Sequence, residues 1–287
     1  PVSNNESEKD NTYLSYNVVI GTSLDVELAN AFAVLEYALL SAPGAPLKQA
    51  LLDAGIGKDI MGSYDSGTYQ PVFSVTAKYA NASDKQAFLE IIEKELKRQV
   101  EQGIDKKALL AGINNMEFKF READYGSFPK GLIYGIDCMD SWLYDENQPF
   151  VYLKQLDVFQ KLREKTKTSY FEELIQKWIL ENTHASILIA EPQRGLTAKM
   201  EEELCQKLAA YKASLSKEEI NELVTKTKKL RQFQETPSSK EELEAIPVLK
   251  REDIKKEAAP LYNEEHWIGD TLILHHKMST NGIGYLR

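Results

Sequence analysis

The sequence is poor in the residue types that form covalent cross-links or carry much of enzyme chemistry. Its 287 residues include only two cysteines, Cys138 and Cys205, and four histidines. Because the cysteines lie far apart and form no CxxC pair, they provide neither a disulfide framework nor a cysteine zinc-finger pattern. Both fall at apolar positions of predicted helices, so we expect two buried free thiols, which are compatible with a reducing compartment.

Long apolar runs and basic stripes are also missing. No apolar run reaches the roughly 18 residues that a membrane-spanning helix requires, and the polar start PVSNNESEKDN is neither a signal nor a transit peptide. The formal net charge is −9. We therefore expect neither a membrane nor a nucleic acid as partner. The missing initial methionine, and an end that falls within predicted β structure, suggest a segment of a longer chain.

The short motifs that mark common catalytic sites are absent. HxxEH, HExxH, GxSxG, the P-loop and GxGxxG do not occur. No histidine is placed to form a dyad with a cysteine, and His184, at the start of a predicted strand, is expected to be structural. Carboxylates such as Glu90 form solvated i, i+4 pairs with lysines. We therefore assign no catalytic residue and no metal ligand.

One alternative concerns the histidines near the C-terminus. His275 and His276 are adjacent on a predicted strand and therefore point to opposite faces, which makes a shared metal difficult. Glu264, Glu265 and His266 add further donors nearby. A zinc site would need three or four of these ligands to converge. The expected state is a solvated strand end that binds no metal.

Hydrophobic periodicity predicts an α+β fold for the first part of the chain. Strands are expected at 12–20, 58–64, 69–79 and 184–190, and helices at 25–41, 47–54, 83–103, 105–122, 131–144, 151–164 and 170–180. In the third strand Val72, Ser74, Thr76 and Lys78 alternate with Phe73, Val75, Ala77 and Tyr79, and one of these faces is drier. This pattern predicts a mostly antiparallel sheet with helices packed on one face.

The composition shifts after residue 192. Charged helices are predicted at 196–211 and 217–233, and the capping box that begins at Ser216 lies between them. Their narrow apolar stripes predict a long antiparallel helical hairpin, and Trp267–Met278 predicts a strand pair or one bulged strand. We therefore expect an α+β domain at 1–192, a helical hairpin linker at 193–260, and the initial strands of a following, truncated domain at 261–287.

The stretch EFKFREADYGSFPKGL, residues 117–132, joins two predicted helices through a tight turn. Ser127 is expected to cap the second helix, and Pro129 to occupy its first turn. Phe128 is the only large apolar residue in GSFPKG, so we expect it to be buried between the flanking helices. The alternative is an exposed Phe128 that contacts a substrate or another domain.

Several segments resemble, in the same order, the presequence-protease and falcilysin branch of the pitrilysin, or insulinase, zinc metallopeptidases. They are YLSYNVVIG, APLKQALLDAGIGKDI, QPVFSVTAKYAN, GSFPKGL, QETPSSKEELEAIPVLKREDIKKE and LILHHKMSTNGIGYL. The resemblance covers about Thr12 to Arg287. Members of this family are single chains of four similar α+β domains, in which a helical hairpin joins two halves around a peptide chamber. The resemblance implies the second domain, the hinge and the start of the third domain.

The same resemblance implies a role for this segment. The family's HxxEH zinc motif lies in its first domain. The resemblance therefore implies zinc binding and proteolysis for the parent protein, but it implies neither of them for this chain alone. The segment would form part of the chamber wall and the hinge, and its partners would be the other domains and short unstructured peptides. Arg121, Glu122, Phe128 and Lys130 are the candidates for chamber or interdomain contacts.

Two other hypotheses stay open. In the first, the parent is a zinc-less homologue, in which this fold acts as a scaffold or as a peptide-binding or assembly module. In the second, the chain is a free-standing metal-binding protein that uses the cluster between His266 and His276. For location we expect a bacterial cytoplasm, or an organelle matrix if the source is eukaryotic.

Overall fold

The computed structural model describes residues 7–247, 249–254, 257, 263–277 and 280–286. They form two compact units: unit 1 comprises Pro1–Gly195 with Thr280–Arg287, and unit 2 comprises Leu196–Ser279. The strands of unit 1 are β1 (Thr12–Val19), β2 (Asp59–Asp65), β3 (Val72–Ala80) and β4 (Ala185–Ala190). Its helices are α1 (Val26–Glu36), α2 (Pro46–Asp53), α3 (Lys85–Gln102), α4 (Lys106–Glu122), α5 (Lys130–Trp142), α6 (Leu156–Lys165) and α7 (Tyr170–Ile175).

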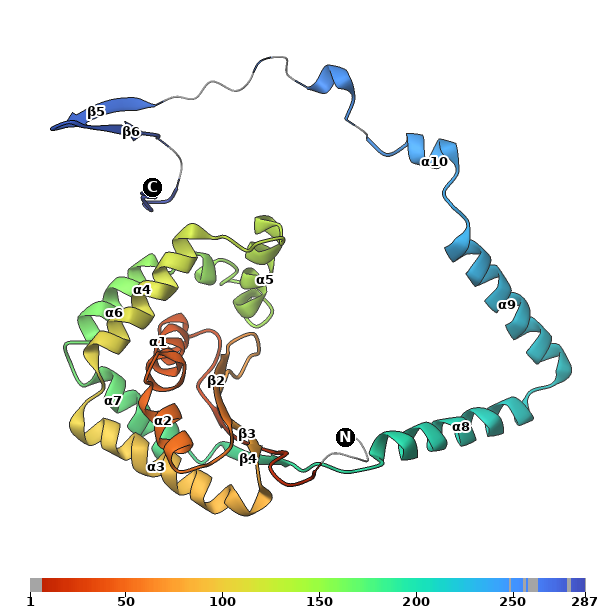
Figure 1. The fold of residues 1–287 in the computed structure, drawn as a ribbon, viewed down its shortest axis with the longest axis horizontal. Coiled ribbons are helices and arrows are strands. Elements are labelled where there is room, and N and C mark those ends of the chain that lie inside the picture. Colours follow the sequence, from red (N-terminus) through yellow and green to blue (C-terminus); the bar gives the residue numbers. More distant parts are fainter. Residues whose placement is uncertain (1–6, 248, 255–256, 258–262, 278–279, 287) are drawn as a thin grey trace. The chain divides into compact units, whose positions relative to one another are not determined.

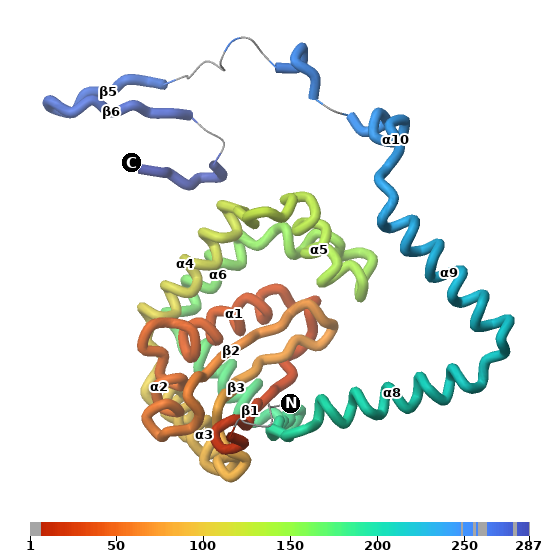
Figure 2. Tube along the Cα trace, turned by 45° about the vertical axis from the view of Figure 1, so that its right-hand side comes forward, coloured from red at the N-terminus to blue at the C-terminus, as the bar shows by residue number. Residues whose placement is uncertain are grey.

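The sheet of unit 1 has the order β2-β3-β1-β4, and all of its strand pairs are antiparallel. Helix α1 contacts β2, α3 contacts β1, and α4 and α6 pack on α1 as an outer layer. Figure 1 shows α1, α4 and α6 together on one side of β2 and β3, and Figure 2 shows α4 and α6 side by side outside α1. The predicted α+β class, with an antiparallel sheet and helices on one face, is confirmed.

The core lies between the sheet and α1. Leu14 and Val18 of β1 and Phe73 of β3 are fully buried, and Phe32 of α1 packs edge-to-face on Phe73 with ring centroids 6.1 Å apart. The helical run Val26–Asp53 is long and apolar enough to meet the composition criteria for a membrane span. Most of it is buried within unit 1, which is what a central core helix requires.

The bulge between β1 and β3 changes the predicted alternation. The register shifts between Thr12 and Leu14, and Tyr79 adopts a left-handed backbone with φ of 58°. Tyr79 is therefore exposed, whereas Ala80 is buried. The prediction that placed Tyr79 on the same face as Phe73 is wrong, because one extra residue in a bulge inverts the side-chain alternation beyond it.

The start of α3 differs from the one that the local sequence predicts. Its entry is a capping box formed by Asn81 and Asp84, in which Asp84 Oδ2 accepts a hydrogen bond from the Asn81 backbone N–H at 2.8 Å. The sequence favoured a box that begins at Ser83. A single turn of 3-10 helix, Ala82–Asp84, moves the true start back to Asn81.

Unit 2 contains α8 (Leu196–Ser214), α9 (Lys217–Glu235), α10 (Lys240–Glu244), β5 (Glu264–Ile268) and β6 (Thr271–His275). The predicted capping box forms at the start of α9, where Ser216 Oγ accepts from the Glu219 backbone N–H at 3.2 Å. Strands β5 and β6 form an antiparallel hairpin, so the strand-pair alternative is confirmed. Parts of the predicted linker and final segment, including 255–256, 258–262 and 278–279, lie outside the described residues.

The helices of the predicted hairpin form, but their apolar stripes do not pack against each other. Within the described residues α8 and α9 bury no side chain. Leu204 on α8 and Leu230 on α9 are therefore exposed. Cys205 is exposed for the same reason, which corrects the expectation of two buried thiols, whereas Cys138 is buried as predicted.

Candidate functional site

The turn between α4 and α5 is held by its own backbone. Ala123 ends α4 in a left-handed conformation with φ of 47°, and Gly126 follows with φ of 61°. Asp124 Oδ1 accepts a hydrogen bond from the Gly126 N–H at 3.0 Å. Pro129 is the N-cap of α5, and no side chain caps this helix. The predicted cap by Ser127 is therefore absent, because Ser127 precedes the N-cap position by two residues.

Phe128 is not the buried anchor that the sequence favoured. Its side chain is 63% exposed. The apolar stripe of α4 faces α1 and α6, so it is not free to cover the turn. The aromatic contact across the turn is instead the edge-to-face pair Tyr125–Tyr134, with ring centroids 6.1 Å apart. Phe128 is thus available to a partner, as in the alternative interpretation.

A half-buried ion network fixes the end of α4 to α6. Arg121 Nε lies 2.7 Å from Glu117 Oε1, and Arg163 Nη2 lies 2.5 Å from Glu117 Oε2. Burial opposes ionisation of Glu117, but the hydrogen bonds and charges of the two arginines outweigh it and hold the pKa of this carboxyl below its usual value. The network explains why Arg121 lies along the helix and not free in solvent.

The end of α4 also contacts the C-terminal segment of unit 1. Arg121 Nη1 donates to the Asn281 carbonyl at 3.2 Å, and Asn281 Nδ2 donates to the Arg121 carbonyl at 3.3 Å. Tyr285 Oη donates to Glu122 Oε1 at 2.9 Å. Lys130 Nζ lies 3.5 Å from the Glu122 carbonyl, near the C-terminus of α4. Arg121 and Glu122 therefore already have hydrogen-bond partners within unit 1.

Helix α5 presents an apolar face that nothing in the described part of unit 1 covers. Leu132, Ile136, Met139 and Leu143 recur at helical spacing, and each is more than 40% exposed. Phe128 precedes this row in sequence and is also exposed. Exposed apolar residues in such a row mark a surface that contacts another part of a protein or a ligand.

Acidic groups on the other side of α5 lie beside the β2–β3 turn. Burial, followed by the negative charges of Asp137 and Asp65, raises the pKa of Asp140 to about 6. A Cβ placed on Gly67 of this turn would lie 3.9 Å from Asp140 Oδ1, which shows how near the turn is. Tyr69 of the turn and Tyr144 beyond α5 also pack together, with ring centroids 5.1 Å apart and ring planes tilted by 47°.

We expect Asp140→Asn to stabilise unit 1 at neutral pH. The folded-state pKa of Asp140, about 6, exceeds the unfolded value of about 3.9. Below pH about 4 the carboxyl is protonated in both states and does not lower the free energy of unfolding. As the pH rises through about 6 the folded carboxyl ionises, and this stability is lost. In urea melts at pH 7, the free energy of unfolding of the variant should exceed that of the wild type by about 1 kcal/mol. This is less than the full pKa difference would give, because water screens the half-buried group.

Asp145→Asn is the matched control of opposite sign. Hydrogen bonds from Gln148 and Asn147 lower the pKa of Asp145, so its stabilising effect is present at neutral pH and is lost in acid. This variant should be less stable than the wild type at pH 7. If both variants were more stable than the wild type at pH 7, the cause would be the removal of a negative charge from the protein and not the environment of Asp140.

One face of the sheet, which no helix covers in the described part of unit 1, is a polar surface that sequence reasoning did not single out. Ser15 and Asn17 on β1 pair with Thr76 and Ser74 on β3. Ser15 Oγ lies 2.9 Å from Thr76 Oγ1, and Ser74 Oγ donates to Asn17 Oδ1 at 2.7 Å. The alternation in β3 was its only sequence signal. The centre of this open face consists of Ser15, Asn17, Met61, Ser63, Ser74, Thr76, Ser186 and Leu188.

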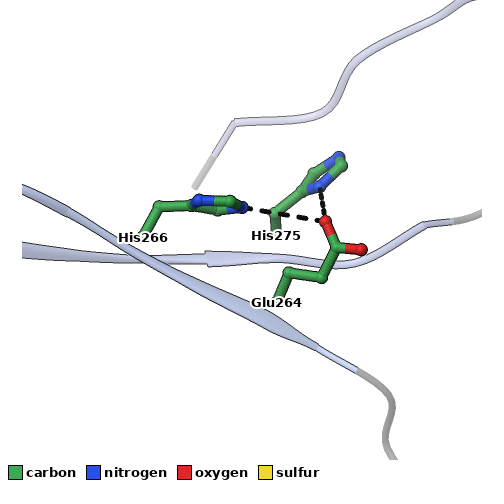
Figure 3. A group of neighbouring side chains, drawn as sticks. All are labelled: Glu264, His266 and His275. Atoms are coloured by element: carbon green, nitrogen blue, oxygen red, sulfur yellow. Dashed lines mark hydrogen bonds and ion pairs between the residues drawn. The ribbon is translucent and has the colours of Figure 1, made fainter.

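The groups that could hold a metal lie on the β5–β6 hairpin of unit 2 (Figure 3). Glu264, His266 and His275 each offer one ligand atom, and these atoms all lie within 4.8 Å of one another. His276 and Glu265 are not part of this group. Sequence reasoning considered all five donors but could not select the three that converge, because that depends on the strand register. No such group includes His184 among the described residues.

Comparison with known proteins identifies the class. The model of the peptidase M16 inactive domain matches residues 1–116, and that of the associated region of peptidase M16 subfamily C matches residues 191–287. The chain therefore contains the inactive α+β domain of a metallopeptidase and the region associated with it. It belongs to the M16, or pitrilysin, family of zinc metallopeptidases, in the presequence-protease branch.

Curated relatives support this assignment over nearly the whole chain. Protein HypA of Clostridium perfringens is 42% identical over 285 residues, which cover 99% of this chain and 29% of that protein. Presequence protease 1, chloroplastic/mitochondrial, of Arabidopsis thaliana is 32% identical over 266 residues, which cover 91% of this chain and 25% of that protein. The chain thus spans between a quarter and a third of the length of these relatives.

Among solved structures, the peptidase M16 inactive domain from Pseudomonas fluorescens aligns with 63% of this chain and 41% of that chain. The TM-score is 0.46 and the sequence identity 14%. The assignment to the family rests on the sequence matches and not on this alignment.

Proposed function

We propose that this chain is a non-catalytic segment of a zinc metalloendopeptidase that degrades short unstructured peptides. In this proposal residues 1–192 form part of the chamber wall, 193–260 form the hinge between the halves, and 261–287 begin the following domain. The observation that carries the proposal is the match to an inactive M16 domain and its associated region in a sequence without an HxxEH motif.

The open face of the sheet supports the assignment as a chamber wall. Its eight central positions carry hydroxyl, amide and apolar side chains, whereas charged residues lie at the ends, Asp59 and Lys78 at one end and Asp65 at the other. Such a surface offers hydrogen bonds to an extended peptide without selecting one charge sign. The overall charge of −9 adds a long-range attraction for basic peptides.

The exposed surfaces of α5 and of the α4–α5 turn support contacts with other domains of the parent. Phe128 and the apolar row on α5 would be covered by a neighbouring domain or would line the chamber. Lys130 lies at the same turn and would take part in that contact. Arg121 and Glu122 would act at the interdomain contact, since they already bind the segment that contains Asn281 and Tyr285.

Helices α8 and α9 support the assignment as a hinge. Their apolar stripes are exposed along most of their length, and they meet at the short connection before Ser216. A pair of helices held together only at one joint can change its angle at low energetic cost, because little buried surface is lost.

The chain alone is expected to hydrolyse no peptide. A fluorogenic unstructured peptide should show the same rate with the purified chain as with buffer, because the sequence contains no motif that would position a zinc-activated water. Cleavage that disappears with a chelator would overturn this expectation. The same assay on the full-length parent should show chelator-sensitive cleavage.

Open-face variants of the full-length protein test the chamber wall. Thr76→Lys and Leu188→Arg place long cations where the peptide would lie, and kcat/KM for a short peptide should fall by about tenfold, equivalent to about 1.4 kcal/mol. Bound zinc should not change. Gln86→Arg on the exposed side of α3 is the matched control and should retain full activity. Unchanged kcat/KM in both open-face variants would reject the wall assignment.

The rival proposal is a zinc-less homologue that uses the same fold as a scaffold or as a peptide-binding module. A chelator-sensitive assay of peptide cleavage by the full-length protein separates the two, because the peptidase requires a zinc-activated water in its first domain and the scaffold does not. For location we propose a bacterial cytoplasm, supported by the similarity to Protein HypA. The organellar relative supports an organelle matrix as the alternative.

A further inference from the structure

The donors of the β5–β6 hairpin that could bind a metal share one face. The register pairs Glu264 with His275 and His266 with Ile273, so Glu264, His266 and His275 point the same way. The donor face also carries Ile268 and Ile273, and the opposite face carries Glu265, Trp267, Leu272 and Leu274. The three donors are exposed and therefore accessible to a metal ion.

The three side chains converge on one carboxylate oxygen. Glu264 Oε2 lies 3.5 Å from His275 Nδ1 and 3.7 Å from His266 Nε2. Ligand atoms about 2.0–2.1 Å from a tetrahedral zinc are roughly 3.3–3.4 Å from one another. Both distances are close to this edge length, and Figure 3 shows both rings directed toward the carboxylate. The ligand atoms of the two histidines lie within 4.8 Å of each other, so the imidazole rings would turn toward each other when one ion binds all three atoms.

We propose that Glu264, His266 and His275 bind a divalent transition-metal ion such as Zn²⁺ or Ni²⁺. Two imidazole nitrogens with one carboxylate oxygen form a donor set that favours these ions over Mg²⁺ and Ca²⁺, which prefer oxygen ligands. Three protein ligands leave further positions for water. This site is separate from the family's zinc motif, and it replaces the sequence-based expectation that the chain binds no metal.

Lys277 tunes the site without occupying it. Its Nζ lies 2.6 Å from Glu264 Oε1, so it holds the carboxylate through the oxygen that does not face the histidines. The positive charge of Lys277 opposes the binding of a cation at the same carboxylate. Lys277→Gln should increase the affinity for Zn²⁺.

Metal titration of the whole chain with matched neighbours tests the proposal. Calorimetry with Zn²⁺ should give one ion per chain, and Co²⁺ should give a visible absorption band from its bound histidines. His266→Ala, His275→Ala and Glu264→Gln should each weaken Zn²⁺ binding by at least about tenfold, the loss of one ligand. His276→Ala and Glu265→Gln change the adjacent residues, which are not part of the group, and should bind like the wild type.

The matched variants also separate a site from non-specific binding. If His276→Ala lost as much affinity as His275→Ala, or if the wild type bound no Zn²⁺, the proposal would be overturned. Because all three ligands are exposed, their substitution should leave the circular dichroism of the chain unchanged. The result is independent of the peptidase proposal, which assigns cleavage to a zinc motif outside this chain.

Discussion

Phe159→Ala is expected to lower the free energy of unfolding of unit 1 by about 3–5 kcal/mol, the usual cost of truncating a buried phenylalanine. Phe159 on α6 is 2% exposed, and its ring packs edge-to-face on Phe120 of α4 with centroids 5.8 Å apart. Alanine would leave a cavity between the two helices that form the outer layer. Urea melts of the wild type and the variant measure the loss directly.

Phe128→Ala is the control, because it removes the same side chain from an exposed position. Its cost should remain below about 1 kcal/mol, as for other surface substitutions. In the full-length protein the same variant should weaken peptide binding or domain contact without changing zinc content. A loss of stability equal to that of Phe159→Ala would show that Phe128 is buried in solution.

Hydrogen exchange should divide the chain into two regions of very different protection. Helices α3 and α4 bury residues such as Leu96 and Ile113, so their amides should exchange only through global unfolding. The free energy of that unfolding is typically about 5–15 kcal/mol. Helices α8 and α9 bury no side chain, and they therefore lack the tertiary packing from which most helical stability in proteins comes. Their protection factors should be lower by at least about a thousandfold.

Mass-spectrometric exchange resolved by peptide measures this difference, and the cap at Ser216 provides a control. Ser216→Ala removes the hydrogen bond to the Glu219 N–H and should speed exchange in the first turns of α9 while leaving α3 unchanged. Equal protection of 204–230 and 92–120 would contradict both the exposed stripes and the proposed boundary near residue 192.

The sequence determined the elements that depend on contacts within a few residues. Alternating and four-residue apolar patterns located the strands and helices of unit 1 because these periods follow from backbone geometry alone. The capping box at Ser216 formed as predicted because both of its hydrogen bonds lie within one turn. The order of the matching segments also determined the family, which the comparisons confirmed.

Features that depend on contacts between distant residues could be decided only by the tertiary structure. The bulge that turns Tyr79 outward arises from the register of β3 against β1. Phe128 and Cys205 are exposed because no described element covers them, although the sequence places both at apolar positions. The packing of the two charged helices likewise depends on what covers their stripes, and no local pattern contains that information.

Both functional surfaces show the same division between local and long-range causes. The sequence indicated the alternation in β3, but only strand pairing put Ser15 beside Thr76 on one open face. The sequence also supplied Glu264, His266 and His275 as donors. Their convergence depends on a hairpin register that places residues 264 and 275 opposite each other, and one residue of slip would send His275 to the other face.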